Sequence, residues 1–157
     1  MITIRKYKEN DLPELKLLSG ELHEELRQFD KRLAPTEEII EPYFKYLLDR
    51  ISSTEGTFFI AEADGQIMGH LCFFGRVDPL EPDVYPGQNS FIAELYVKPA
   101  YRRQKIADRL LKEAETYTRS LGINRIEMAV LHENVNAHAV FQAKGYRESV
   151  HILSKEL

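Results

Sequence analysis

Four cationic side chains lie close together in the stretch AELYVKPAYRRQKIADRLLKEAE, residues 93–115: Lys98, Arg102, Arg103 and Lys105. They fall between an apolar, strand-like run and an amphipathic, helix-like run, in a chain whose formal net charge is −4. A helix N-terminus offers unpaired N–H groups and the positive end of the helix dipole, and both attract anions. Isolated cations usually just solvate a loop. Four of them at a helix start predict an anion-binding site.

The motifs around these cations indicate which anion is bound. The chain has no G-x-x-x-x-G-K-[ST] and no G-x-G-x-x-G after a strand, so it lacks the usual nucleotide-binding loops. One group of residues fits the pattern L-x-V-x-P-x-[YF]-R-x-x-G-[IVL]-[GA]: Leu95, Val97, Pro99, Tyr101, Arg102, Lys105, Ile106 and Ala107. A second group fits N-x-x-A-x-x-[LF]-Y-x-[KR]-x-G-[FY]: Asn134, Ala137, Gly145 and Tyr146. Together, these motifs resemble the fingerprint of the GNAT superfamily of N-acetyltransferases over nearly the whole chain.

The resemblance implies that acetyl-CoA is the anion. Its pyrophosphate would be held by backbone amides from Arg102 through Ala107. Its pantetheine arm would lie where the strand at Leu95–Val97 splays from a neighbouring strand at 124–131. The cofactor-binding residues implied in this way are Leu95, Tyr96, Val97, Arg102, Arg103, Gln104, Lys105, Ile106, Ala107, Asn134 and Phe141.

Two positions depart from the family pattern. Lys105 stands where the family usually has glycine, which lets the backbone approach phosphate without a side chain in the way. Phe141 stands where the family has a tyrosine that is often assigned as the acid for the leaving thiolate. Either another donor serves, with Tyr96, Tyr146 and His138 as candidates, or the thiolate leaves unassisted, or the domain does not catalyse.

The resemblance also implies direct attack of a neutral amine on the thioester carbonyl. The developing oxyanion would be stabilised by backbone N–H near Val97. Glu94 is the candidate catalytic base that removes the amine proton, and the alternative is a structural carboxylate on the sheet face. Asn134 could cap the following helix, contact the cofactor, or do both.

Acidic residues in the first helices and in the loop 76–90 could attract a cationic amine, although charge runs are usually just solvated surface. These residues, together with His23, are Glu21, Glu24, Glu25, Asp78, Glu81 and Asp83.

Length and composition place the chain among soluble, single-domain proteins. Its 157 residues predict one domain, 1–157, with a real core. No signal-like or membrane-spanning segment occurs, which favours a cytoplasmic location and no membrane partner. The acidic composition argues against a nucleic-acid partner. The five histidines lack metal-ligand spacing, so no metal is predicted, and the single cysteine, Cys72, is interpreted as buried packing.

Hydrophobic periodicity predicts the element order β-α-α-β-β-β-α-β-α-β. We expect strands near 2–8, 57–63, 66–75, 91–97 and 125–130, and one or two closing strands in 146–157. We expect helices from an N-cap at Asn10 or Asp11 to about Phe29, over 39–51 with a regular start only at Pro42, from Ile106 to Leu121, and over 134–145. Asp64-Gly65 predicts a hairpin turn. The fold class expected is a mixed α/β fold of GNAT type. It would have a mostly antiparallel central sheet of six to seven strands, helices on both faces and splayed central strands.

The sequence therefore predicts an acetyl-CoA-dependent N-acetyltransferase. Its acceptor would be a primary amine of a small molecule, or less favourably of a peptide or protein. The alternative is a non-catalytic acyl-CoA-binding regulatory module, for which Phe141 is the main support. Whether the chain forms a homodimer is left open.

Overall fold

A computed structural model describes residues 1–83 and 87–157. Its strands are β1 (Thr3–Lys6), β2 (Thr57–Ala63), β3 (Gln66–Val77), β4 (Asn89–Val97) and β5 (Ile126–Met128). Its helices are α1 (Leu12–Leu26), α2 (Thr36–Ser53), α3 (Ile106–Ser120) and α4 (Val135–Ala143), with 3₁₀ turns at Glu9–Asp11 and Pro99–Tyr101. The predicted order is confirmed through α4.

The strands form one sheet in the order β1-β2-β3-β4-β5. The first four strands pair antiparallel, and β5 pairs parallel to β4. Asp64 and Gly65 join β2 to β3 with φ values of 52° and 74°, the positive values that a tight hairpin turn needs. The predicted mostly antiparallel sheet and its hairpin are confirmed.

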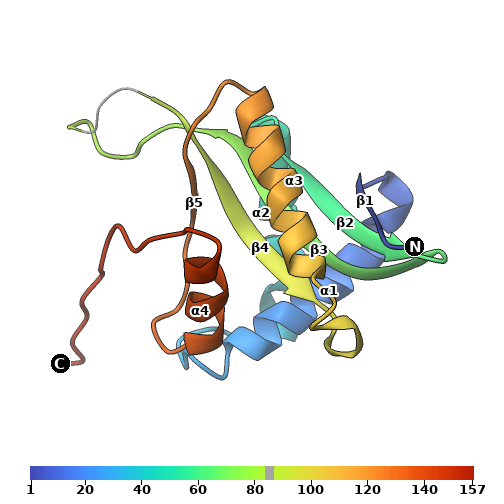
Figure 1. Cartoon of the computed structure of the whole chain (residues 1–157). Coiled ribbons are helices and arrows are strands. Elements are labelled where there is room, and N and C mark those ends of the chain that lie inside the picture. The colour runs from blue at the N-terminus through green and yellow to red at the C-terminus, as the bar shows by residue number, and fades with distance from the viewer. Residues whose placement is uncertain (84–86) are drawn as a thin grey trace.

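The expectation of six to seven strands is wrong: within the described residues the sheet has five. The segment 146–157, predicted to supply closing strands, has no regular structure and extends away from the body (Figure 1). Val150 and Ile152 alternate as in a strand, yet their side chains are exposed. Alternation indicates a half-buried strand only where a neighbouring backbone and a core are present to receive it.

Two hydrophobic cores lie on opposite faces of the sheet, as the predicted helices on both faces require. Helices α1 and α2 cover one face, burying Leu15, Leu18, Phe44 and Leu47. Helix α3 covers the other face and buries Leu110, Leu111 and Ala114, on the side facing the viewer in Figure 1. These residues recur at helical spacing, so the stripe read in the sequence is the buried face of each helix.

Helix α2 begins earlier than predicted, at Thr36, so that Pro42 lies inside it. Proline removes one intrahelical hydrogen bond, the one that the Glu38 carbonyl would accept. Both residues are exposed, so water can satisfy that carbonyl. The apolar stripe on the opposite side of α2 is therefore undisturbed.

The predicted loop at 76–90 begins only after β3 ends at Val77 and closes where β4 starts at Asn89. Its residues 84–86 lie outside the described part of the chain. Among the residues that are described, no helix has the length and apolar character needed to cross a membrane.

Strands β3 and β4 approach so closely at Gly69 that a side chain is excluded there. An added Cβ would lie 2.5 Å from the Tyr96 carbonyl oxygen and 3.0 Å from the Val97 Cα. We expect Gly69→Ala to lower the free energy of unfolding by about 1–3 kcal/mol, because backbone must move. Gly20→Ala is the control: its Cβ would meet nothing closer than 3.4 Å. Because Gly20 lies inside α1, Gly20→Ala should raise the free energy of unfolding by roughly 0.5–1 kcal/mol. Equal effects in urea denaturation would contradict the packing argument.

Candidate active site

A bulge in β4 sets the direction of the Glu94 side chain. Cys72 pairs with Glu94 and the next residue, Phe73, pairs with Ile92, so Ala93 is an extra residue in the ladder. Such a bulge shifts the two-residue alternation of side chains. Ile92 therefore packs in the core under α3, whereas the Glu94 carboxylate reaches α1 on the opposite face. Simple alternation in the sequence does not predict this reversal.

The Glu94 carboxylate is buried in a polar network. The Ser19 hydroxyl of α1 donates to Glu94 Oε2 over 2.8 Å, and His70 Nε2 of β3 lies 2.7 Å from the same oxygen. The side chains of His70 and Glu94 are 0% and 2% exposed. Neither His70 nor Ser19 was among the residues predicted for the site. The one signal in the sequence that could have indicated His70 is its position in the apolar run GHLCFF, where a polar side chain is unusual.

Two further titratable groups lie near this carboxylate. Burial raises the pKa of the Tyr43 phenol, with smaller contributions from the Glu94 charge and from hydrogen bonding to its carboxylate. Burial and, to a smaller extent, the Glu94 charge raise the pKa of the Cys72 thiol well above its ordinary value. Both groups are therefore neutral at pH 7. Cys72 is buried packing, as predicted.

Strand β4 has an open edge beside Glu94. Its pairing with β5 ends at Ile92–Met128, and in Figure 1 the two strands then diverge. On the other edge, the Lys98 N–H donates to the Met68 carbonyl. Because N–H and C=O groups alternate sides along a strand, those of Leu95 and Val97 face the open edge. This separation lies at Leu95–Val97, where the resemblance implied it.

The start of α3 presents a row of free backbone donors. The first bond into the helix runs from the Arg109 N–H to the Lys105 carbonyl. Within the described residues, the backbone N–H groups of residues 103–108 donate no hydrogen bond. Arg103 and Lys105 have φ values of 67° and 60°, in the left-handed region. This explains why glycine is usual at the position of Lys105: L residues rarely adopt that conformation.

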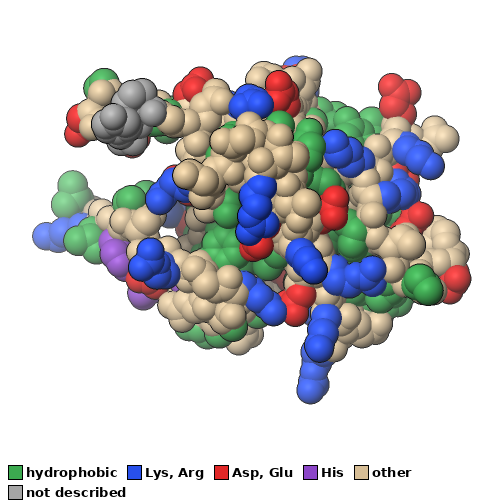
Figure 2. Space-filling view, turned by 45° about the horizontal axis from the view of Figure 1, so that its top comes forward, with side chains coloured by type: hydrophobic (Ala, Val, Ile, Leu, Met, Phe, Trp, Pro, Cys, Tyr) green, Lys and Arg blue, Asp and Glu red, His purple; other side chains and the backbone are tan. Residues whose placement is uncertain are grey.

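Two of the four clustered cations are paired with helix α1. The Arg102 guanidinium donates to Glu25 over 2.6 Å and to the Val97 carbonyl over 2.9 Å. Lys98 donates to Glu14 over 2.7 Å. The side chains of Arg103 and Lys105 are exposed on the surface at the start of α3. Figure 2 shows Lys and Arg side chains interspersed with acidic ones over this side of the molecule.

The acidic residues of α1 are also largely engaged. Glu21 accepts a hydrogen bond from the Tyr96 hydroxyl over 2.9 Å, and Glu24 pairs with Arg27 and accepts from the Thr36 hydroxyl. Glu25 holds Arg102. Glu24 and Glu25 are thus each paired with an arginine, whereas Glu21, in the part of the chain that the structure describes, is bonded only to a neutral hydroxyl and keeps its negative charge.

Helix α4 contributes Asn134 and Phe141. The Asn134 side chain accepts from the Ala137 N–H over 3.3 Å, which confirms its capping role. Phe141 packs edge-on against Tyr146, with ring centroids 5.9 Å apart. The Tyr146 hydroxyl donates to Glu115, and burial raises the pKa values of both Tyr146 and Tyr96. His138 Nε2 lies 3.2 Å from the Leu131 carbonyl oxygen, so each of the three candidate proton donors already has a partner.

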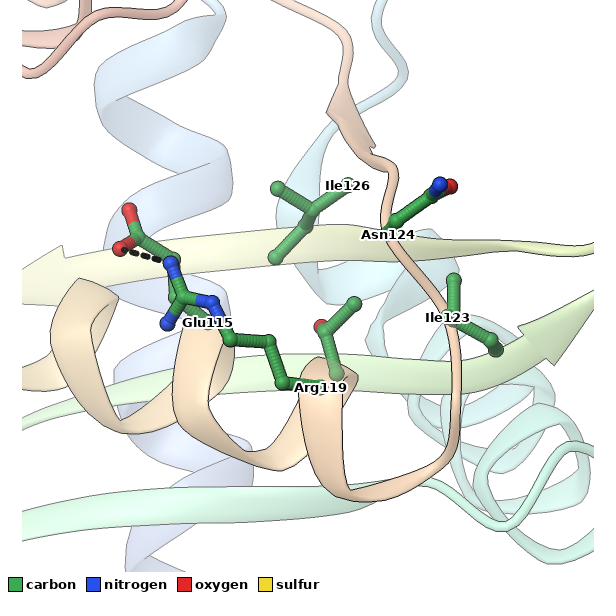
Figure 3. A pocket seen from close by; sticks show the side chains of 6 residues that line it. Glu115, Arg119, Ile123, Asn124 and Ile126 are labelled. Atoms are coloured by element: carbon green, nitrogen blue, oxygen red, sulfur yellow. Dashed lines mark ion pairs between the residues drawn. The ribbon is translucent and has the colours of Figure 1, made fainter.

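A surface pocket of about 280 Å³ lies at the opposite end of α3 from these free N–H groups. Figure 3 shows it between the last turns of α3 and the chain leading into β5. It is lined by Glu115, Thr118, Arg119, Ile123, Asn124 and Ile126. No residue singled out in the sequence lines it.

Comparisons with known proteins agree with this architecture. The sequence model of the family described as acetyltransferase (GNAT) family matches residues 21–146. Thialysine N-epsilon-acetyltransferase of Bos taurus is 24% identical over 155 residues, covering 94% of this chain and 85% of that protein.

Two solved structures show the same fold at low identity. A tetramutant of a Bacillus halodurans protein, BH1408, matches with a TM-score of 0.85 at 18% identity, over 99% of both chains. A predicted acetyltransferase of Clostridium acetobutylicum, solved with acetyl-CoA, matches with a TM-score of 0.74 at 18% identity. That match covers 99% of this chain and 96% of the other.

The left-handed conformation at Lys105 predicts the effect of restoring glycine there. An L residue in that region costs roughly 1–2 kcal/mol, and glycine loses roughly 0.5–1 kcal/mol of backbone freedom. We expect Lys105→Gly to raise the free energy of unfolding by up to about 1 kcal/mol. The matched control is Lys112→Gly on the exposed side of α3, which should lower it by about 1 kcal/mol. Destabilisation of equal size by both changes, measured by thermal unfolding, would contradict the assignment.

Proposed function

The chain belongs to the acetyltransferase (GNAT) family, and we propose that it transfers the acetyl group of acetyl-CoA to a primary amine of a small molecule. Membership in this family makes it an acyltransferase. The cosubstrate, the acceptor class and the roles of individual residues are the proposal.

One observation carries this proposal: β4 separates from β5 immediately before Glu94 and then leads to the free N–H groups at the start of α3. An extended thioester arm needs an unpaired strand edge, and a pyrophosphate needs backbone donors at a helix N-terminus. Strand β4 offers the first at Leu95 and Val97. The 103–108 segment offers the second, at the end of the same strand.

The residues present fit acetyl-CoA in this arrangement. The N–H groups of Arg103, Gln104, Lys105, Ile106 and Ala107 follow one another at the start of α3, where several of them would donate to the pyrophosphate. The Ile106 side chain is buried, so its backbone is anchored in the core. The exposed Arg103 and Lys105 add positive charge nearby. The Arg102 N–H already donates to the Pro99 carbonyl over 3.3 Å, which corrects the expectation that its backbone amide holds the pyrophosphate. Arg102 would instead serve through its guanidinium, by exchanging Glu25 for a phosphate oxygen.

Glu94 is proposed as the base for the acceptor. It takes a proton from the protonated amine, directly or through water, and leaves a neutral nitrogen with a free electron pair. That nitrogen attacks the thioester carbonyl carbon: a C–N bond forms, and the carbonyl electrons move to oxygen. The Val97 N–H, on the open edge, is proposed to donate to that oxyanion. The oxyanion electrons then re-form the carbonyl as the C–S bond breaks, CoA leaves as the thiolate, and the second proton on nitrogen passes to water.

The proposal assigns no side chain as the acid for the thiolate. Phe141 has no proton to give, and the hydroxyls of Tyr96 and Tyr146 donate to carboxylates. A thiolate is a sufficiently good leaving group to depart unassisted. Much of the rate would then come from orienting amine and thioester, an effect of roughly 7–11 kcal/mol.

The acceptor is proposed to be a small amine. The relative from Bos taurus, which covers most of the chain, is named for acetylation of thialysine, a small amino acid with a side-chain amine. A peptide or protein amine is the second choice. The second candidate function, a non-catalytic acyl-CoA-binding module, is favoured by Phe141 and by the near-complete burial of Glu94.

Binding of acetyl-CoA tests the cofactor site. A ligand at about 100 times its dissociation constant adds about 2.7 kcal/mol of stability. For a chain of this size, we expect the melting temperature to rise by about 5–10 °C. The rise should be lost when both Arg102 and Arg103 are replaced by alanine, whereas Arg125→Ala, a control far from α3's N-terminus, should keep it. No rise at millimolar acetyl-CoA would exclude both candidate functions.

Turnover distinguishes the enzyme from the binding module. We expect the native protein to release CoA thiol from acetyl-CoA in the presence of thialysine, 1,4-diaminobutane or benzylamine, detected with a thiol reagent. Buried Cys72 adds little background. Glu94→Gln should lower kcat by roughly 10²–10⁴-fold, the usual contribution of a general base, while the melting shift with acetyl-CoA remains. Unchanged kcat in that variant would remove Glu94 as the base.

A further inference from the structure

His70 is buried against Glu94 and has no role in the proposed reaction as described so far. It extends from the middle of β3, and its ring is 0% exposed. The Phe58 ring lies edge-on to it at 5.6 Å and the Tyr96 ring at 6.3 Å, so aromatic contacts hold its plane. A rigid polar side chain bonded to a candidate base could control that base.

The hydrogen bonds available to His70 decide where its protons lie. Nε2 contacts Glu94 Oε2, whereas buried Nδ1 has no partner within the described parts of the chain. If the ring is doubly protonated, its Nδ1–H is a buried donor with no acceptor. The same holds if Nε2 accepts a hydrogen bond from a neutral Glu94, because the ring proton then lies on Nδ1. A neutral ring protonated on Nε2 leaves only an unpaired acceptor. Because an orphaned donor in the interior is costly, this last arrangement is favoured.

The neutral ring makes Glu94 an acceptor from two donors. His70 Nε2–H and the Ser19 hydroxyl both bond to Oε2. Donors to an ionised carboxylate favour its charged form. With Oε2 occupied twice, Oε1 is the oxygen that these two donors leave to take a proton, and the Tyr43 hydroxyl is the further donor near the carboxylate.

We infer that His70 is a positioning residue: its neutral Nε2–H holds Glu94 ionised and oriented, with Oε1 available to receive the amine proton. This inference rests on the proposed function, because it explains how the proposed base Glu94 is kept ionised and oriented. His70 acts through Glu94 and does not itself touch the amine. Ser19 of α1 is the second donor to the same oxygen.

The groups that face this pair are few. Helix α2 contributes Tyr43, β3 contributes Cys72, and β4 contributes Tyr96, whose hydroxyl is bonded to Glu21 of α1. Burial raises the pKa values of all three, so they stay neutral through the range from pH 5 to 8. Strand β2 contributes only the Phe58 ring. None of the three groups Tyr43, Cys72 and Tyr96 therefore changes its charge over the pH range in which the kinetics are measured.

Kinetics of two substitutions test the inference. His70→Leu removes the donor, and we expect kcat with thialysine to fall roughly 10–100-fold with little change in the KM for acetyl-CoA. The acid limb of the kcat profile should move to higher pH, because the ionised carboxylate loses a hydrogen bond. His70→Gln places an amide N–H near the Nε2 position and should restore most of kcat and the original acid limb. His151→Leu, in the exposed tail, is the control and should match the native protein.

Three kinetic results would overturn the inference: unchanged kcat in His70→Leu, equal losses in the Leu and Gln variants, or a lower kcat with an unmoved acid limb. The melting temperature and its shift with acetyl-CoA identify a variant that has merely lost its fold. In that event, Ser19→Ala probes the same oxygen and should move the acid limb in the same direction. No movement in Ser19→Ala would then count against the network.

A measurement without turnover separates this inference from the proposed function. Long-range ¹H–¹⁵N correlation spectra of the ¹⁵N-histidine-labelled native protein, with the His70 signals identified by their loss in His70→Gln, report the protonation of each ring nitrogen. We expect a neutral ring protonated on Nε2 at pH 7. A ring protonated on Nδ1, or on both nitrogens, would overturn the inference. If the spectra agree but the native protein transfers acetyl to none of the three amines, the proposed function fails and the catalytic role of His70 fails with it.

Discussion

The structure around the candidate site depends on one extra residue in one strand. Ala93 interrupts the β3–β4 ladder, so Ile92 remains in the core beneath α3 while Glu94 turns to the face beneath α1 and α2. Pairing with β5 ends at the residue before the bulge. A bulge bends and twists its strand, so a single insertion accounts both for the direction of the carboxylate and for the point where the strand edge becomes free.

The cost of burying Glu94 explains why its surroundings are polar in an otherwise apolar layer. A buried carboxylate is tolerated only when donors replace the water it has lost. Ser19 and His70 supply two such donors from different elements, α1 and β3. The network therefore links one helix to the centre of the sheet. Within residues 1–83 and 87–157, it also leaves His70 Nδ1 without a partner, in a place that a purely structural core would fill with an apolar side chain.

Helix α1 connects the proposed acceptor and cofactor regions. Glu14, Glu21 and Glu25 bond to Lys98, the Tyr96 hydroxyl and Arg102, which lie along the end of β4 and the loop after it. Such partly exposed contacts contribute little stability, since water and salt screen them. They can exchange partners at low cost. Carboxylates of α1 thus balance the charges of Lys98 and Arg102. Because these pairs exchange easily, both cations can still bind an anion.

The sequence by itself determined the elements whose signals are local. Periodic apolar residues placed the helices and the first five strands, Asp64-Gly65 placed the hairpin, and the spacing of residues 95–107 indicated the family and its anion site. Only the tertiary structure decided the rest. The bulge at Ala93 and the meeting of Ser19, His70 and Glu94 depend on residues up to 75 positions apart. The tail at 146–157 has the alternation of a strand but no backbone to pair with. Short-range patterns record what a segment favours alone, whereas register and partners arise only when distant segments pack together.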